Sequence, residues 1–398
     1  MLSQAFVACP YEDAPGRALS LPDLTGSIGF DPYDRPSIRV GVIGTGFGAS
    51  LHLSALRENP DFETVAICSR RPERARAAAI DHGIPSHFAD YRELVRDPEI
   101  DAVIVASPPH LHHPMSIAAL EEGKHVLCEK PMARNLAEAR DMLRIAERVG
   151  TIAMVNNQLR FLPVRMRVAE LIAEGYIGEP HAASIVVHRS SLNDPHERPW
   201  GWLMEMEKAG GMLGATGAHY LDALRWWFGD VKAVAGAVST MVRQRRLPDS
   251  SAMAKVDADD NFAVILRFGN GALGTIHVTA TAGHEGDEEI TLSGSEGTLA
   301  IRQGRLLGAR HGDFSLSELP VPDRLLGGLV PGGHFLVQPT TLLLRTWAQA
   351  IRDGIPASPS FADGVKTQEL IDGVLRSSQQ GRWIDTSGAR WPMAGSAL

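Results

Sequence analysis

A glycine-rich turn is the first feature of the chain with a clear chemical use. It reads Gly44-Thr45-Gly46-Phe47-Gly48-Ala49, and it lies between an apolar run and a stretch with helical periodicity. In such a turn the first glycine allows the tight bend, the second lets the backbone approach a phosphate, and the small Ala49 lets helix and strand pack closely. Because free N–H groups at a helix start bind anions, the turn predicts a bound dinucleotide. The alternative is a glycine turn in a flavodoxin-like domain.

The residues after the second predicted strand indicate which dinucleotide is bound. NAD-binding domains usually carry an acidic residue about 20 positions beyond the glycines, where it binds the ribose. Here the strand ends Cys68-Ser69-Arg70-Arg71, without a carboxylate. Ser69 can donate to a 2′-phosphate and both arginines can neutralise it, so NADP is favoured over NAD. The alternative is that the arginines face solvent, or that Arg70 only stacks on the adenine.

A lysine ends another apolar run, in the segment His-Val-Leu-Cys-Glu-Lys-Pro at 125–131. Open parallel sheets bind ligands at the carboxyl ends of their strands, which is where Lys130 is expected. Desolvation there would lower the pKa of the lysine and suit it to proton transfer. Pro131 fixes the local backbone, and a cis peptide bond is possible. A structural salt bridge with Glu129 is an equal competitor.

The elements that position these residues form two groups. The first group alternates apolar strands with helical patterns and predicts a parallel sheet covered on both faces. Its strands are 38–43, 63–68, 102–106, 125–128 and 152–155, and its helices 48–58, 72–82, 114–122 and 135–149. The second group has longer alternating strands and predicts an open, mostly antiparallel sheet. It contains the strands 261–268, 272–280, 289–293 and 298–302, and the helices 164–174, 340–352 and 363–378.

Domain boundaries follow from this change of pattern. We expect an N-terminal extension at 1–36, an NAD(P)-binding Rossmann domain at 37–158, a substrate-binding and oligomerisation α+β domain at 159–385, and a tail at 386–398. The proline-containing segment 1–35 is interpreted as an extended arm or a floppy tail. The basic run Arg243–Arg246 is expected in a solvated loop.

Composition excludes several classes of protein. With 398 residues and a net charge of −8, the chain gives no reason to expect nucleic acid or an anionic membrane as a partner. No apolar run reaches the roughly 18 residues of a membrane span, and the first residues do not resemble a signal peptide. Three cysteines give no disulfide or metal-ligand spacing, so we expect a cytoplasmic protein without a metal site, with Cys68 and Cys128 buried.

Several of these segments together resemble the glucose–fructose oxidoreductase / inositol dehydrogenase (Gfo/Idh/MocA) family. The resemblance covers about residues 37–385, and the Glu-Lys-Pro motif at this distance from the glycine turn is specific. The matching segments are Gly41–His52, Ala106–His112, Gly123–Met132, Leu159–Pro163, Gly175–Pro180, Gly210–Asp222 and Pro359–Gly364.

The resemblance implies a Rossmann domain followed by a domain with a large open sheet, whose free face packs in homodimers or homotetramers. It implies hydride transfer between NAD(P) and a carbinol carbon of a sugar, polyol or related compound. Lys130 would be the catalytic lysine and His219 the catalytic histidine, with Lys130 polarising the substrate oxygen and His219 taking or giving the proton. The alternative is that the two roles are reversed. The further cofactor contacts implied are Ser107, Pro108, His112, Glu129, Lys130, Asn157 and Arg160.

One position departs from the family pattern. Relatives often place an aspartate four residues before the histidine, where this chain has Ala215. Either Lys130 and His219 suffice, or another residue substitutes, or catalysis is weak or lost.

The substrate is the least specified part of the site. Asn157, Arg160, Trp200 and Asp222 are candidate substrate residues, since polar groups and an aromatic ring suit hydroxyl recognition. The alternatives are that the polar residues at 156–158 only mark the end of a strand, and that Trp200 is a core anchor. Two other functions remain open. One is a redox-neutral enzyme that recycles a tightly bound cofactor in each turnover, and the other is a catalytically impaired cofactor-binding sensor.

Overall fold

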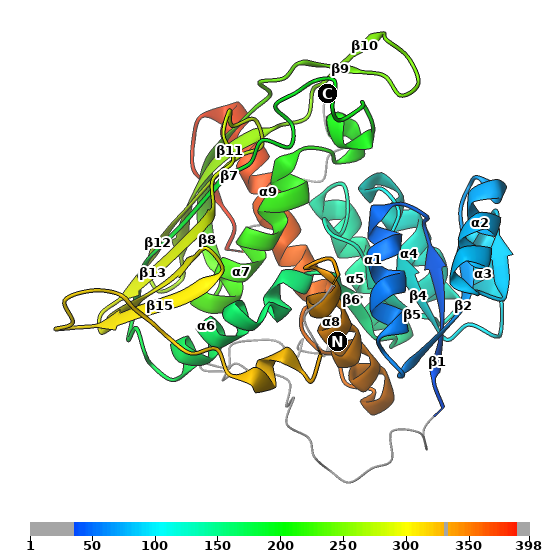
Figure 1. Ribbon diagram of the computed structural model, residues 1–398, viewed down its shortest axis with the longest axis horizontal. Helices are drawn as coiled ribbons and strands as arrows, with labels where there is room; N and C mark the ends of the chain where they lie inside the picture. Colours follow the sequence, from blue (N-terminus) through cyan, green and yellow to red (C-terminus); the bar gives the residue numbers. More distant parts are fainter. Residues whose placement is uncertain (1–35, 330–332, 388–398) are drawn as a thin grey trace, which may run out of the picture.

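Two β-sheets dominate the fold, and helices lie between them (Figure 1). The computed structural model describes residues 36–329 and 333–387. The proposed arm at 1–35 and the tail from 388 onward lie outside the described residues. The boundaries predicted for the two domains are not tested by this arrangement and stay a prediction.

The first sheet has six parallel strands in the order β3-β2-β1-β4-β5-β6, as the alternating pattern predicted. Its strands are β1 (Ile38–Ile43), β2 (Phe62–Cys68), β3 (Ser86–Phe88), β4 (Ala102–Val105), β5 (His125–Cys128) and β6 (Ala153–Val155). Its helices are α1 (Phe47–Arg57), α2 (Pro72–His82), α3 (Tyr91–Arg96), α4 (His112–Glu121) and α5 (Leu136–Val149). The sequence did not predict β3 and α3, because elements of three and six residues are too short to show a period.

Local signals explain where these helices begin. Pro72 occupies the first position of α2, where its missing N–H costs no hydrogen bond. Asn135 caps α5, and its side chain accepts a hydrogen bond from the N–H of Glu138 at 3.0 Å. Cys68 and Cys128 are buried as predicted, and burial raises the pKa of both thiols.

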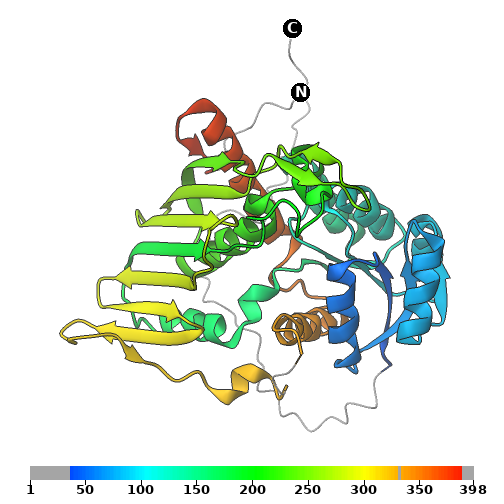
Figure 2. The same ribbon diagram turned by 45° about the horizontal axis from the view of Figure 1, so that its top comes forward.

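The second sheet has nine strands in the order β16-β15-β14-β13-β7-β12-β11-β8-β17. All pairs are antiparallel except β7 with β12, so the prediction of a mostly antiparallel sheet is confirmed. Figure 2 shows these strands as a twisted ladder with helices against one face. Its strands are β7 (Pro180–His188), β8 (Val231–Ser239), β11 (Asn261–Phe268), β12 (Leu273–Thr279), β13 (Glu288–Gly294), β14 (Gly297–Arg302), β15 (Arg305–Arg310), β16 (Ser317–Glu318) and β17 (Ile384–Asp385).

The turn Gly269-Asn270-Gly271 closes the predicted hairpin between β11 and β12, with Arg267 opposite Leu273. Gly271 has φ +91°, which a residue with a side chain rarely adopts. Helices α6 (Pro163–Ala173), α7 (Ala218–Phe228) and α9 (Phe361–Gln380) cover the face of the sheet that is turned towards the Rossmann half (Figure 1).

The basic run Arg243–Arg246 was expected in a solvated loop, and this is wrong for its last three residues, which form a strand, and above all for the buried Arg245. Residues 244–246 form β9 (Gln244–Arg246), which pairs with β10 (Met253–Lys255). Arg245 is 1% exposed, because a strand turns alternate side chains to opposite faces. Its guanidinium donates hydrogen bonds to the carbonyls of a neighbouring loop, at Leu192, Asp194 and Arg198.

Helix α8 (Val337–Asp353) joins the two halves. By sequence order it falls in the predicted domain 159–385, but in space it packs on α1 and completes the core of the first sheet. The Trp347 ring stacks on Phe62 with their centroids 5.4 Å apart. The chain therefore returns to the Rossmann half after building the second sheet.

Candidate active site between the two sheets

The glycine turn connects β1 to α1 and leaves space beside it. Gly44 has φ +132°, and a Cβ there would lie 2.4 Å from the carbonyl oxygen of Ala106. Around Gly46 a Cβ would meet no atom within 4 Å, among the residues that the structure describes. Gly46 is also the N-cap of α1, and no side chain caps the first N–H groups of the helix. An open cradle with free N–H donors fits the pyrophosphate of a dinucleotide.

The residues after β2 lie next to this turn. The hydroxyl of Thr45 donates to Ser69 Oγ at 3.2 Å, and the N–H of Arg71 donates to the same oxygen at 3.3 Å. Arg70 and Arg71 are exposed, and within 36–329 and 333–387 neither side chain forms an ion pair. Ser69 is thereby fixed at the turn, and two guanidinium groups remain uncommitted beside it.

His112 connects two loops of the Rossmann half. Its ring is fully buried, with Nδ1 2.9 Å from the carbonyl of Pro131 and Nε2 2.7 Å from the carbonyl of Ser107. Burial lowers its pKa, and a neutral ring has one N–H, which donates to one of these carbonyls. His112 thus ties the Ser107–Pro108 loop, after β4, to the loop after β5. A direct contact of His112, Ser107 or Pro108 with cofactor stays a prediction.

Lys130 follows β5, and its peptide bond to Pro131 is cis. Its Nζ donates a 2.6 Å hydrogen bond to the carbonyl oxygen of Ala215 in the π-helical turn Leu213–Gly217. Burial lowers the pKa of Lys130, although the charge of Glu129 acts in the opposite direction. The amine is therefore desolvated, and it connects the loop after β5 to the turn that precedes α7.

The alternative salt bridge between Lys130 and Glu129 is not what the structure shows. Glu129 Oε1 instead lies 3.0 Å from His52 Nε2 and accepts from the amide of Asn156 at 2.8 Å. Its other oxygen accepts from the backbone N–H of Lys130 at 3.1 Å. Burial alone would raise the pKa of Glu129, but the hydrogen bond and charge of His52, with Lys130 and Asn156, lower it to about 2. Glu129 thus joins α1 and β6 to the backbone of the lysine loop.

His219 lies on α7, four residues after the carbonyl that holds Lys130. It is 7% exposed, and its Nδ1 has no hydrogen-bond partner among the described residues. Burial, followed by the charges of Lys130 and Arg165, lowers the pKa of His219 well below its usual value. The ring is therefore neutral near pH 7 and has a free nitrogen for another group.

Asp259, which the sequence did not single out, supports the start of the turn Leu213–Gly217 before α7. Its carboxylate accepts a 2.9 Å hydrogen bond from the N–H of Leu213, and its carbonyl accepts one from Met212. Burial raises the pKa of Asp259 to about 7. Its position just before β11 carries no helical period, so only the contact itself reveals the role.

Two of the candidate substrate residues bind each other. Arg160 Nε and Nη2 each donate to a carboxylate oxygen of Asp222 at 2.6 Å. The same guanidinium donates to Ser358 at 2.7 Å and to Asp363 at 3.3 Å. Arg160 is 6% and Asp222 1% exposed, so this cluster ties the residues after β6 to α7 and to the start of α9. A contact of either residue with a ligand stays a prediction.

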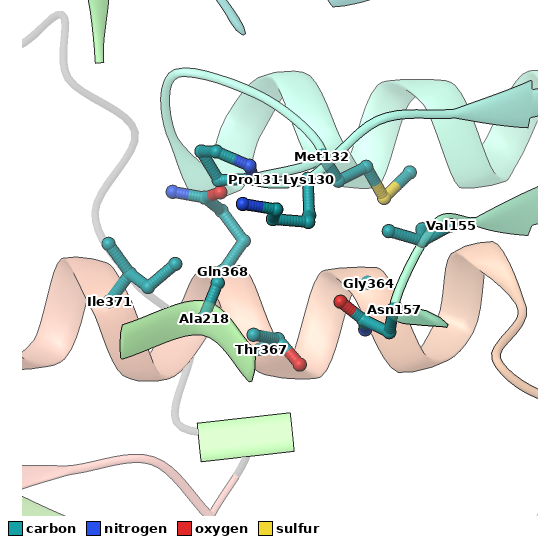
Figure 3. A pocket seen from close by; sticks show the side chains of 10 residues that line it. All are labelled: Lys130, Pro131, Met132, Val155, Asn157, Ala218, Gly364, Thr367, Gln368 and Ile371. Atoms are coloured by element: carbon teal, nitrogen blue, oxygen red, sulfur yellow. The ribbon is translucent and has the colours of Figure 1, made fainter. Parts of the chain in front are cut away.

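The other two candidates differ in their surroundings. Asn157 is buried and lines a small pocket with Lys130 between β6 and α9 (Figure 3). Trp200 is half-buried and donates from its indole to the carbonyl of Lys255 at 2.9 Å, while the amine of Lys208 lies 5.8 Å from its ring. The structure therefore places Asn157, and not Trp200, beside Lys130.

The described residues contain neither a candidate metal centre nor a candidate membrane span. No cluster of three or more His, Cys, Asp or Glu side chains could hold a metal ion there. No helix in that part of the chain is long and apolar enough to cross a membrane.

Comparison with known proteins covers most of the chain. The model of an oxidoreductase family with an NAD-binding Rossmann fold, GFO_IDH_MocA, matches residues 38–157. The model of the GFO/IDH/MocA C-terminal domain matches residues 166–300.

Relatives of known activity span the chain to different extents. Levoglucosan dehydrogenase of Pseudarthrobacter phenanthrenivorans is 29% identical and aligns over 88% of this chain and 98% of its own. The 1,5-anhydro-D-fructose reductase of Ensifer adhaerens is 36% identical over 60% of this chain and 68% of the reductase. A solved levoglucosan dehydrogenase in complex with NADH and L-sorbose superposes with a TM-score of 0.82 at 29% identity, covering 88% of this chain and 99% of that chain.

Proposed function

The chain belongs to the Gfo/Idh/MocA family of oxidoreductases, and on that premise we propose that it transfers hydride between a nicotinamide cofactor and a carbinol or carbonyl carbon of a sugar, cyclitol or related polyhydroxy compound. The observation that carries this proposal is that buried Lys130 donates a hydrogen bond to the carbonyl of Ala215, four residues before buried His219, whose pKa is lowered in part by the charge of Lys130. The relatives named for levoglucosan and 1,5-anhydro-D-fructose support a sugar-like substrate.

The bound nicotinamide would supply the hydride acceptor or donor, and the protein would manage the proton. Because burial lowers the pKa of Lys130, its amine can be neutral and accept the proton of the substrate hydroxyl. His219 is a poorer proton acceptor, because burial and the neighbouring positive charges oppose its protonated form. We therefore assign proton transfer to Lys130 and orientation of the substrate oxygen to His219.

This assignment has a direct test. Lys130→Met should abolish turnover of the best substrate from a sugar and polyol panel, while NAD(P)H still binds in a fluorescence titration. Oxidation by the wild type should speed up as pH rises through the lowered pKa of Lys130, since the neutral amine then forms. If Lys130→Met turned over at the wild-type rate, the assignment would be wrong.

For the cofactor, we propose NADP over NAD. Ser69 is fixed at the glycine turn, and the guanidinium groups of Arg70 and Arg71 lie uncommitted beside it. A 2′-phosphate would receive one hydroxyl and up to two positive charges there. In the fluorescence titration NADPH should bind more tightly than NADH, and Arg70→Ser combined with Arg71→Ser should remove the difference. Equal or tighter binding of NADH to the wild type would refute this preference.

We also propose that the open face of the large sheet packs against a second copy of the chain. On β11 and β12 the side chains directed away from the helices include Ile265 and Leu273, which are 44% and 50% exposed. Light scattering should report a dimer or tetramer for the wild type, and Ile265→Asp with Leu273→Asp should yield monomers. A monomeric wild type would overturn this proposal. The cytoplasmic location expected from the sequence stays a prediction.

A further inference from the structure

A small pocket lies next to Lys130, between the lysine loop and helix α9. It is formed where the loop after β5, the residues after β6, the start of α7 and the face of α9 meet (Figure 3). Its lining residues are Lys130, Pro131, Met132, Val155, Asn157, Ala218, Gly364, Thr367, Gln368 and Ile371.

The polar side chains of this pocket carry unsatisfied atoms. Within the described part of the chain, Thr367 Oγ1, Gln368 Oε1 and both amide atoms of Asn157 are buried without a hydrogen-bond partner. These three residues are 5%, 2% and 2% exposed. Buried polar groups in folded proteins are nearly always hydrogen-bonded, either to protein or to an ordered water. Three such residues around one pocket therefore point to a ligand that both donates and accepts.

The size of the pocket limits what this ligand is. Its volume is about 10 Å³, which is close to what a single water molecule needs and far below what a sugar fills. A water molecule has two donors and two acceptor positions. It can donate to Gln368 Oε1 and Thr367 Oγ1 and accept from the Asn157 N–H and from Lys130 Nζ, which leaves only Asn157 Oδ1 outside this set.

Among the described residues, the amine of Lys130 also has no hydrogen-bond partner on the side of this pocket. A lysine ammonium has three donors, and one of them is used by the carbonyl of Ala215 at 2.6 Å. Under the proposed function a second donor serves the substrate oxygen. The third donor requires another acceptor, because residue 215 has no carboxylate and Glu129 is bound to His52 and Asn156.

We propose that this pocket binds one ordered water molecule, which accepts a hydrogen bond from the ammonium of Lys130 and is held by Gln368, Thr367 and Asn157. The water supplies part of the stabilisation that a carboxylate at position 215 would give to the ammonium. The catalytic meaning of the site rests on the proposed function, but the water site itself does not. No covalent step is involved: when Lys130 is protonated its N–H donates to the water, and when it is neutral its lone pair can accept from it.

Three other titratable groups lie around Lys130 and the pocket. Glu129 lies on the same loop and His219 on α7, and both interact with the charge of the lysine. On α9, Asp372 accepts a 2.9 Å hydrogen bond from the Gln368 amide, and its pKa is raised by burial. Thr367→Val is therefore the cleanest change, because it removes a hydroxyl and leaves all these groups in place.

Thr367→Val should change the melting temperature and the pKa of Lys130 differently, depending on whether the pocket holds a water molecule. If a water is bound, the substitution removes one of its partners, so the melting temperature should fall or stay unchanged. The pKa of Lys130 should also fall, by about 0.5 or more, because the ammonium loses part of its hydration. If the pocket is dry, the substitution removes a buried unsatisfied hydroxyl, so the melting temperature should rise and the pKa of Lys130 should not move.

The pKa can be read directly, because the whole chain has six lysines. ¹³C-lysine labelling of the full chain gives few Cε signals, and the signal missing from Lys130→Met identifies Lys130. The matched control is Thr346→Val on α8, where the hydroxyl donates to the carbonyl of Leu342 at 3.1 Å and lies outside the pocket. This control should leave the pKa of Lys130 unchanged.

A high-resolution crystal structure of the full chain provides a second readout. It should show a water peak within hydrogen-bond distance of Lys130 Nζ and Gln368 Oε1. A dry pocket in that structure, or a Thr367→Val protein in which the pKa of Lys130 is unshifted, would overturn the proposal. Neither readout needs turnover, so a chain that oxidises no sugar or polyol would refute the proposed function and leave the water site standing.

Discussion

The buried pair of Arg160 and Asp222 provides a test that separates support of the fold from contact with substrate. Two 2.6 Å hydrogen bonds join the residues, and neither side chain is more than 6% exposed. Asp222→Asn keeps the shape of the side chain and removes its charge. Arg160 then retains Asp363 at 3.3 Å as its remaining carboxylate partner within the described residues.

The expected loss of stability follows from burial. Removing one partner of a buried ion pair costs about 3–5 kcal/mol, because the other charge is left without compensation. Asp363 offsets part of this cost, so the lower end, about 3 kcal/mol, is expected. Unfolding entropy is about 2 cal/mol/K per residue, or roughly 0.7–0.8 kcal/mol/K for a chain of this length, so the melting temperature should fall by about 4 °C.

Thermal unfolding followed by circular dichroism measures this change, and Glu99→Gln serves as the control. Glu99 also pairs with an arginine, Arg39, but its side chain is 75% exposed, so its loss should cost less than about 1 kcal/mol. Replacing both buried partners, with Arg160→Met and Asp222→Leu, should recover part of the stability lost in Asp222→Asn. A melting temperature of Asp222→Asn within about 1 °C of wild type, combined with a raised KM, would refute this reasoning and place Asp222 against the substrate.

Three further predictions concern the elements around the site. Gly46→Ala should weaken NAD(P)H binding in a fluorescence titration without lowering the melting temperature. Gly44→Ala should instead destabilise the fold, because its Cβ would lie 2.4 Å from a carbonyl oxygen. A Gly46→Ala protein with wild-type affinity would contradict the proposal that the backbone at Gly46 binds the pyrophosphate. The folded-state pKa of Asp259 is raised to about 7 from an ordinary 3.8, so the folded chain holds more protons between these values and loses stability as pH rises through them. Urea unfolding should show the free energy of unfolding falling with pH, by up to about 4 kcal/mol in total, and Asp259→Asn should make this pH dependence flatter. Wild type and Asp259→Asn with parallel pH profiles would contradict this role of Asp259. Arg245→Met should expose the loop at 192–198 to proteases at native pH, and an unchanged cleavage rate would show that the loop holds without the guanidinium.

The sequence predicted most of the Rossmann half because its signals are local. The glycine turn, the capping residue Asn135 and the bare apolar strands each act within about ten residues, and the structure has an element at each of these places. The hairpin at Gly269–Gly271 was predictable for the same reason. Short elements such as β3 carry too few residues to show a period.

The parts that the sequence did not predict depend on contacts between distant segments. Asp259 accepts a hydrogen bond from the N–H of Leu213, 46 residues earlier in the sequence. Arg245 donates one to the carbonyl of Leu192, 53 residues earlier. A basic run is usually solvated, so only the tertiary structure could show that Arg245 is turned inward. Likewise, α8 contacts α1 almost 300 positions earlier in the sequence, and its apolar face alone does not name its partner.

The replacement of the expected aspartate by Ala215 has a limited effect on geometry and a larger one on charge. Lys130 is held by the backbone carbonyl of residue 215, which any residue provides, so its position does not depend on the side chain there. A carboxylate at that place would favour the ammonium, and without it burial shifts the balance towards the neutral amine. His219 is also kept neutral, by burial and by the charge of Lys130 itself. An amine whose pKa is lowered by burial can accept a hydroxyl proton while His219 stays neutral, so Ala215 is compatible with an active site in which the lysine carries the proton alone.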